Sequence, residues 1–116
     1  MGTDQHQPVL LEEVLEALSI QGPEREGGVY LDGTFGRGGH ARAILARLSE
    51  QGCLLALDKD PEAIASGKET FGDDPRFKIA QGSFADMERF VRDWGQERGL
   101  DGILLDLGVS SPQLDN

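Results

Sequence analysis

Apolar residues follow two different patterns along the chain. Two runs, Cys53–Leu57 and Ile103–Leu105, are continuously apolar over the length of a strand, a pattern typical of parallel strands that helices cover on both faces. Val29–Asp32 and Phe77–Ala80 are two further candidate strands. Other stretches repeat apolar residues every three or four positions, which marks one face of an amphipathic helix. The pattern therefore predicts four strands connected by helices.

The predicted elements follow the order helix, three strand–helix pairs and a final strand. Asp60 and Pro61 mark the start of one helix, because aspartate suits the N-cap and proline suits the first helical position. Residues 24–28 are expected to form a polar loop. In chain order we expect helices and strands at 8–18, 29–32, 41–48, 53–57, 61–71, 77–80, 84–94 and 103–105. This alternation predicts an α/β fold, a doubly wound parallel sheet with right-handed crossovers, in a single domain over residues 1–116.

Charge and cysteine content narrow the class of protein. The 116 residues carry 21 acidic and 11 basic side chains, for a formal net charge of -10, so the chain is not built to hold a phosphate backbone by itself. The acidic surface either keeps the protein in solution or is complemented by a basic surface elsewhere in a longer protein. The first residues lack the basic start and apolar run of a signal peptide, so none is expected, and no apolar stretch is long enough to span a membrane. The single cysteine, Cys53, permits no internal disulfide, which predicts a reducing, cytoplasmic location.

Candidate chemistry gathers where the predicted strands end, which is where doubly wound sheets bind their ligands. A glycine-rich turn at 32–40 follows the first strand, Asp58 follows the second, and a segment at 106–113 follows the fourth. Glycines allow a sharp turn and a close approach of the backbone to a ligand. An acid in the position of Asp58 commonly bonds the hydroxyl groups of a ribose. Together these features favour a nucleoside site over an ordinary strand-to-helix turn.

The same turn discriminates between classes of nucleotide. It reads Gly-Arg-Gly-Gly at 36–39, which differs from the Gly-x-Gly-x-x-Gly of nicotinamide dinucleotide sites. The chain contains no Gly-Lys-Ser/Thr, which excludes a nucleoside triphosphate loop. A loop for S-adenosylmethionine (SAM) needs room for a nucleoside and an amino acid tail, and it needs no lysine for phosphates. The turn therefore fits SAM best.

Five successive motifs resemble those of one known family. They are His6–Leu11, Asp32–His40, Asp58–Ala63, Gly82–Phe84 and Asp101–Asp115. Residues 6–116 resemble the N-terminal part of the bacterial 16S ribosomal RNA (cytosine(1402)-N4)-methyltransferases, the family of small subunit methyltransferase H, also called MraW. The resemblance implies a Rossmann-like, SAM-dependent methyltransferase fold with strands in the order 3-2-1-4, and SAM as the cofactor.

The resemblance also implies which residues form the cofactor site. Asp58 is expected to bond the SAM ribose, and Phe84 to pack near the adenine. By position alone, His40 is either a ligand contact or a first-turn polar residue of its helix, and the resemblance favours the contact. Lys59 and Arg37 are expected to be solvated. The implied cofactor-binding residues are Gly36, Gly38, Gly39, His40, Asp58, Phe84, Asp106 and Gln113.

Ser110, Ser111 and Pro112 are the implied catalytic residues, in a segment similar to the Ser-Pro-Pro-Tyr signature of amino methyltransferases. An exocyclic amine is a poor nucleophile because its lone pair is drawn into the ring. Acceptors such as a serine oxygen or a backbone carbonyl hold its N–H groups and turn the lone pair toward the methyl group. Catalysis is then a matter of positioning, and it needs neither a metal nor a covalent nucleophile.

The implied substrate is a cytosine N4 of 16S rRNA in the small ribosomal subunit, with no membrane partner. Family members are considerably longer, so we expect this chain to lack their inserted substrate domain and last strands, and not to methylate RNA unaided. The fourth strand is then expected to have an exposed edge that pairs with a second copy in a homodimer. Two alternatives stay open: a small-molecule methyltransferase of the same fold, and a non-catalytic nucleotide-binding or assembly module.

Overall fold

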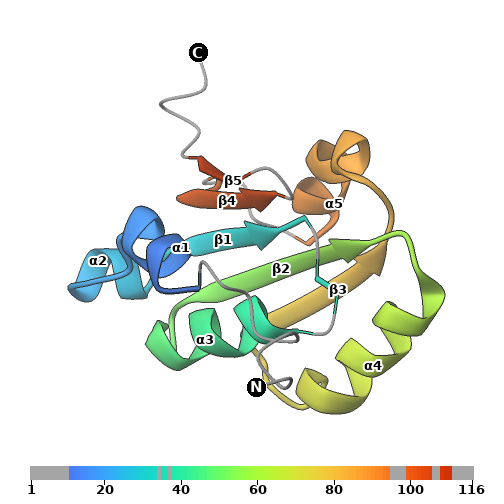
Figure 1. Cartoon of the computed structure of the whole chain (residues 1–116), viewed down its shortest axis with the longest axis horizontal. Helices are drawn as coiled ribbons and strands as arrows, with labels where there is room; N and C mark the ends of the chain where they lie inside the picture. Colours follow the sequence, from blue (N-terminus) through green and yellow to red (C-terminus); the bar gives the residue numbers. More distant parts are fainter. Residues whose placement is uncertain (1–10, 34, 37, 95–98, 106–107, 111–116) are drawn as a thin grey trace, which may run out of the picture.

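The protein folds around one twisted sheet with helices on both faces (Figure 1). A computed structural model describes residues 11–33, 35–36, 38–94, 99–105 and 108–110. The strands are β1 (Val29–Asp32), β2 (Cys53–Asp58), β3 (Phe77–Gln81), β4 (Gly102–Leu105) and β5 (Gly108–Ser110). The helices are α1 (Leu11–Leu18), α2 (Pro23–Glu26), α3 (Gly39–Arg47), α4 (Pro61–Phe71) and α5 (Met87–Asp93).

The four predicted strands are parallel and lie in the order β3-β2-β1-β4. In the register of the sheet, Leu31 of β1 lies opposite Leu55 of β2 and Ile103 of β4. The predicted fold class and strand order are therefore confirmed. Because parallel strands all point the same way, the carboxyl ends of β1, β2 and β3 come together at one edge.

The exposed edge predicted for the fourth strand is wrong. β5 continues the sheet beyond β4 as an antiparallel strand, with Ser110 opposite Ile103 and Gly108 opposite Leu105. Antiparallel neighbours need only a short connection. The three residues of β5 pair with residues 103–105 of β4. The homodimer stays a prediction, but the edge of β4 is not available for it.

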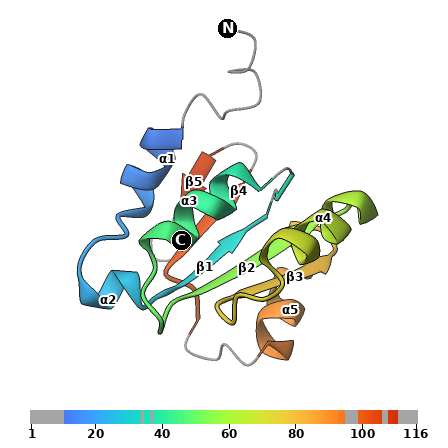
Figure 2. The ribbon, with the colours of Figure 1, turned by 90° about the horizontal axis from the view of Figure 1, so that it is seen from below.

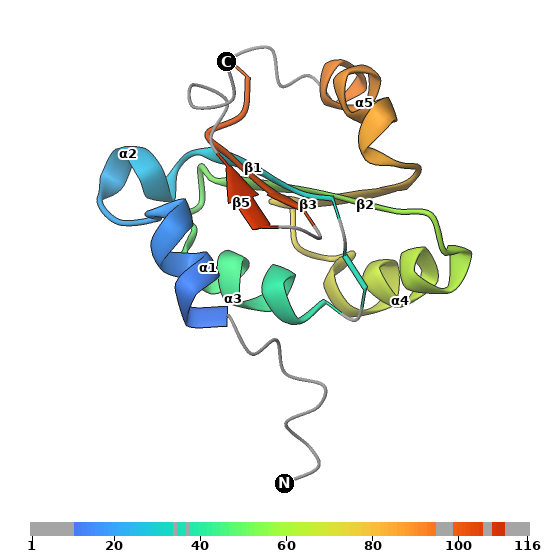
Figure 3. The same ribbon diagram turned by 45° about the horizontal axis from the view of Figure 1, so that its top comes forward.

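The two faces of the sheet bury different residues of the same strands. Figure 3 shows α1, α3 and α4 on one face and α5 on the other. Tyr30, which is fully buried, faces the first set of helices, while its neighbour Leu31 faces α5. Successive residues of a strand point to opposite faces, so a strand covered on both sides is apolar throughout. The continuous apolar run of β2 has this cause, since residues 54–57 are 0% exposed.

The helix boundaries agree with the prediction at α4 and differ elsewhere. Asp60 caps α4, because its Oδ1 accepts a hydrogen bond from the backbone N–H of Glu62 at 2.9 Å. The predicted polar loop at 24–28 instead begins with the single helical turn α2, which has proline in its first turn. The Tyr30 hydroxyl donates to the Arg25 carbonyl at 2.7 Å and ties that turn to the core. The predicted helix at 84–94 starts with a 3-10 turn, η2 (Phe84–Asp86), before α5.

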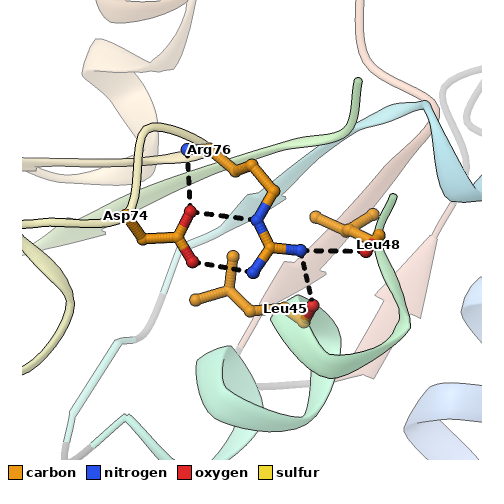
Figure 4. A network of polar contacts seen from close by, with 4 residues as sticks. All are labelled: Leu45, Leu48, Asp74 and Arg76. Carbon is orange, nitrogen blue, oxygen red and sulfur yellow. Dashed lines mark hydrogen bonds and ion pairs between the residues drawn. The ribbon is translucent and has the colours of Figure 1, made fainter. Parts of the chain in front are cut away.

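A polar network closes the carboxyl end of α3 (Figure 4). Arg76, just before β3, donates from Nη1 to the carbonyls of Leu45 at 2.8 Å and Leu48 at 2.9 Å. Asp74 holds the guanidinium through two hydrogen bonds, at 2.9 Å to Nε and 2.7 Å to Nη2. The hydrogen bond from Arg76 lowers the pKa of the Asp74 carboxyl, and the same bond raises the pKa of Arg76. The last carbonyls of α3 are thus satisfied by a residue from another element.

Among the described residues, no helix is both long and apolar enough to cross a membrane.

Candidate functional site

The loop between β1 and α3 is tied to both neighbouring strands. We refer to its described residues, Gly33, Phe35, Gly36 and Gly38, as the glycine loop. The Gly33 N–H donates to the Leu104 carbonyl of β4 at 2.8 Å, and the Phe35 N–H donates to the Leu57 carbonyl of β2 at 3.2 Å. Gly36 has φ 57° and Gly38 has φ 85°, values that side chains rarely tolerate. The loop therefore takes a defined course over the carboxyl edge of the sheet.

Asp58, the last residue of β2, joins this loop to the start of α4. Its Oδ2 accepts the Gly36 N–H at 2.8 Å, and its Oδ1 accepts the Asp60 N–H at 2.9 Å. An ionised carboxylate has about four lone-pair sites, so two backbone donors leave acceptor capacity for a ligand. The sequence placed Asp58 correctly at the end of its strand, while its bond to ribose stays a prediction.

The amino end of α3 lies directly after the glycine loop (Figure 2). Gly38 is its N-cap residue, in the left-handed conformation, and glycine has no side chain with which to cap a helix. The first backbone N–H groups of a helix lack partners within it and carry a partial positive charge. This end of α3 is therefore suited to hold an anionic or polar group.

His40, in the first turn of α3, is half-buried, and one of its ring nitrogens, Nε2, is buried without a hydrogen-bond partner among the described residues. Burial lowers the pKa of His40 below 6.5, because desolvation disfavours the charged imidazolium. A buried ring nitrogen without a partner among the described residues is consistent with the predicted ligand contact, which stays a prediction.

An open pocket lies at the carboxyl ends of β2 and β3. It has a volume of about 460 Å³. It adjoins Asp58, since Gln81 pairs with Asp58 in the sheet and the Gly82 N–H donates to the Asp58 carbonyl at 2.9 Å. The Gln81 side chain also donates to the Lys59 carbonyl at 3.0 Å. The residues lining the pocket are Lys59, Gln81, Gly82, Ser83 and Asp86.

Sequence reasoning missed most of this pocket, although a signal was present. Ser83 and Asp86 have the spacing of a capping box, and their side chains accept hydrogen bonds from backbone N–H groups at the start of η2. Asp86 Oδ2 accepts the Ser83 N–H at 3.0 Å, and Ser83 Oγ accepts the Ala85 N–H at 3.2 Å. The backbone hydrogen bond from Ser83 lowers the pKa of Asp86. The Ser-x-x-Asp spacing was visible in the sequence and locates the wall of the pocket.

The remaining predicted site residues are placed only in part. Ser110 lies in β5, and Phe84 begins η2, next to the pocket residue Ser83. Gly39 is the first residue of α3. The other predicted residues, Asp106, Ser111, Pro112 and Gln113, lie outside the described residues.

One buried acid at this edge was part of the glycine-rich motif but was not predicted as a site residue. Asp32, the last residue of β1, is 0% exposed and lies opposite Ala56 and Leu104 in the sheet. No group of three histidine, cysteine or acidic residues able to hold a metal ion occurs in the part of the chain that the structure describes.

Comparison with known proteins places the chain among methyltransferases. The family model described as the MraW methylase family matches residues 3–116. The chain is 53% identical over 111 residues to "Ribosomal RNA small subunit methyltransferase H" of Shewanella oneidensis. It is 55% identical over 111 residues to the protein of the same name from Nitrosococcus oceani. Each match covers 96% of this chain and 34% of the relative, so the chain spans about a third of the length of these curated relatives.

Solved structures share the fold at low sequence identity. A putative O-methyltransferase from Klebsiella pneumoniae has a TM-score of 0.55 and 18% identity, over 85% of this chain and 53% of that one. The O-methyltransferase from Bacillus cereus in complex with SAH has a TM-score of 0.50 and 19% identity, over 91% of this chain and 60% of that one. These likenesses show the methyltransferase fold.

Proposed function

Because this chain belongs to the MraW methylase family, we propose that it binds SAM and serves the transfer of a methyl group to cytosine N4 of 16S rRNA. The relatives named for ribosomal RNA support the substrate, and the neighbour solved with SAH supports the cofactor. The whole activity belongs to a protein of which the matched region is about a third, so we assign the cofactor-binding role to the described residues.

The observation that carries the cofactor proposal is the placement of the Asp58 carboxylate. It ends β2 at the carboxyl edge of the sheet, and it bonds the N–H of Gly36 in the glycine loop at 2.8 Å. A ribose held by Asp58 therefore lies beside the glycine loop. Hydrogen bonds from ribose hydroxyls to an ionised acceptor are stronger than bonds between neutral groups.

The surroundings of Asp58 fit the two ends of SAM. On one side, the pocket beside Gln81 and Ser83 offers about 460 Å³ for the adenine. Phe84, which follows Ser83, is the residue that we assign to pack near the adenine. On the other side, the uncapped start of α3 suits the carboxylate of the amino acid tail. Gly36 and Gly38 adopt positive φ and present backbone rather than side chains to this end. We assign His40, with its unpaired Nε2, to the same tail.

The chain's own part in the reaction is positioning. SAM, when bound, supplies a methyl group activated by its sulfonium charge. We propose that the Ser110–Gln113 segment accepts hydrogen bonds from the N4 amine and turns its lone pair toward that methyl. Ser110 is the last residue of β5 and lies opposite Ile103 of β4, not at the carboxyl edge of the sheet. The support for this segment is therefore the membership of the chain in the family. Alignment of this kind accounts for a large part of such rate enhancements.

Calorimetry with four ligands tests the cofactor proposal. We expect the chain to bind S-adenosylhomocysteine (SAH) and SAM, and to show no heat with NAD or ATP at the same concentrations. For an Asp58→Ala variant, Asp73→Ala is the matched control for charge, because Asp73 is an exposed acid just after the carboxyl end of α4. Binding of NAD or ATP without SAH would overturn the proposal in favour of a nucleotide-binding module.

The substrate proposal needs a separate test. We expect disruption of the gene in its host to remove N4-methylcytidine from nucleoside digests of 16S rRNA, measured by mass spectrometry. Re-expression of the intact gene should restore it. An unchanged level of N4-methylcytidine in the 16S rRNA would contradict the substrate while leaving the cofactor proposal intact.

A further inference from the structure

We infer that Gly67, in the middle of α4, is a positioning residue for the glycine loop, because its lack of a side chain leaves room for the ring of Phe35. This inference rests on the proposed function, since it concerns the geometry of the proposed cofactor site. Gly67 lies outside every segment to which the sequence assigned chemistry. Its contact with Phe35 means that α4 supports the glycine loop as well.

Phe35 is the anchor of the glycine loop. Although it lies between two loop glycines, it is only 3% exposed. Its ring meets Phe71 of α4 edge-on, with centroids 6.1 Å apart and planes at 88°, and lies 5.8 Å from the ring of Phe77 in β3. Edge-to-face pairs of this kind favour a particular ring orientation. The loop is therefore fastened to the core by a side chain, in addition to its backbone bonds.

Two glycines leave the space that the Phe35 ring occupies. A Cβ on Gly67 would lie 3.1 Å from Cζ and 3.2 Å from Cε2 of Phe35, and 2.7 Å from Cδ1 of Ile79. A Cβ on Gly38 would lie 3.0 Å from Phe35 Cζ. Ile79 can turn its terminal methyl away, but the ring is rigid and is confined by Phe71 and Phe77. An added methyl at Gly67 must therefore push the ring by a few tenths of an ångström.

The displacement of the ring reaches the proposed cofactor site through two adjacent peptides. The Phe35 N–H is bonded to the Leu57 carbonyl at 3.2 Å, and the next N–H, that of Gly36, is bonded to Asp58 Oδ2 at 2.8 Å. A ring pushed from the side of α4 moves the backbone that makes both bonds. Gly67 thus acts on Asp58 through Phe35 without touching the ligand.

The helix itself does not need glycine at this position. Gly67 is an interior residue of α4, its backbone is not in the left-handed region, and alanine is the better helix former. A replacement by alanine therefore strengthens α4 locally, and any harm arises from the contact with Phe35 and Ile79. This separation makes the variant informative.

The first readout is made on the ligand-free protein. In Gly67→Ala we expect the amide NMR resonances of Phe35 and Gly36 to shift, because the hydrogen bonds to Leu57 and Asp58 change length. By calorimetry we expect SAH affinity to fall ~10-fold, the size expected when a hydrogen bond to a charged group is weakened. Unshifted Phe35 and Gly36 resonances together with unchanged SAH affinity would overturn the inference.

Rescue and a matched control distinguish positioning from general destabilisation. Phe35→Leu in the Gly67→Ala background relieves the contact, and we expect it to regain part of the lost affinity, so that the two substitutions are not additive. Gly52→Ala is the control, because its Cβ would lie 2.6 Å from the Glu26 carbonyl at the amino end of β2. It should lower the melting temperature without moving the Gly36 resonance or SAH affinity. Equal loss of affinity in Gly52→Ala, or additive losses in the double variant, would contradict the inference.

The readouts also separate this inference from the proposed function. If the wild-type chain binds no SAH, the cofactor proposal fails, while the shift of the Gly36 resonance in Gly67→Ala still tests the support of the loop. If SAH binds and Gly67→Ala changes neither readout, the cofactor proposal stands and the role of Gly67 fails.

Discussion

The two ends of α3 are completed in opposite ways. At the carboxyl end, the carbonyls of Leu45 and Leu48 accept hydrogen bonds from Arg76, which Asp74 holds in place. At the amino end, Gly38 occupies the N-cap and provides no side chain. An N-cap glycine costs only a few tenths of a kcal/mol relative to serine or aspartate. The carboxyl end of α3 is therefore closed by side chains, whereas the amino end, which we assign to the ligand, is left open at little cost.

A second comparison, between the starts of α3 and α4, shows that helices beginning at this edge are not all left uncapped. α4 also starts at the carboxyl edge of the sheet, directly after β2, and it is capped by Asp60 with a bond of 2.9 Å to the Glu62 N–H. The two helix starts lie at the same edge, so their position alone does not explain the difference. The contrast favours a ligand role for the start of α3 and a structural role for the start of α4.

The largest expected effect comes from removing the acid beside the open end. In Asp58→Ala, the acceptor for Gly36 and the proposed acceptor for the ribose are both lost. We expect SAH binding to weaken by about 1.5–3 kcal/mol, which is roughly 10- to 150-fold, in isothermal titration calorimetry. Asp73→Ala removes the same charge from an exposed position and should leave the affinity unchanged. An Asp58→Ala variant with wild-type affinity would remove the basis of the comparison.

Removing the side chain that closes the carboxyl end of α3 should lower the stability of the protein and leave ligand binding unchanged. In Arg76→Ala, the carbonyls of Leu45 and Leu48 lose a charged donor in a site where the arginine side chain is 23% exposed. We expect the free energy of unfolding in urea to fall by about 2 kcal/mol, with SAH affinity of the folded protein unchanged. The exposed Arg92→Ala variant should stay within about 0.5 kcal/mol of the wild type. A loss of SAH affinity in Arg76→Ala would mean that the two ends of α3 are coupled.

The contribution of the Arg76–Asp74 pair to stability should also depend on pH. Since Arg76 lowers the pKa of Asp74 below 3.8 in the folded state, the pair contributes fully above pH 3.8 and is lost as the pH falls through the folded pKa. We therefore expect the difference in unfolding free energy between wild type and Arg76→Ala to be constant near neutral pH and to shrink below about pH 3.8. Urea titrations at a series of pH values measure it. A difference that grew toward low pH would contradict this sign.

The smallest expected effect concerns His40 at the open end. Burial lowers its pKa below 6.5, so the unfolded chain takes up this proton at a higher pH than the folded protein does. Stability should therefore fall slightly as the pH drops from about 6.5 through the folded pKa. In a His6→Gln variant, which keeps His40 as the chain's one histidine, proton NMR of the ring should give a midpoint below 6.5. A midpoint at or above 6.5 would show that the ring is solvated or paired with an acid.

The part of this structure that the sequence determined by itself is the part governed by local pattern. The continuous apolar run of β2, the helix period of α3 and the Asp60–Pro61 start of α4 were each predicted because the signal and the structure lie within the same few residues. The location of Asp58 at the end of β2 followed from the same pattern. The topology of the strands followed because parallel strands joined by helices admit few arrangements.

Only the tertiary structure decided which distant groups meet. β5 is too short to carry a periodic signal, and it pairs because the edge of β4 is beside it. The Arg76 bonds to Leu45 and Leu48 join residues about 30 positions apart, and the turn of α2 depends on Tyr30. In the same way, the glycine loop is held by Asp58 from β2 and by Phe35 in a space left by Gly67 of α4. Local pattern records the propensity and burial of each segment, whereas bonds and clearances between segments exist only after the chain has folded.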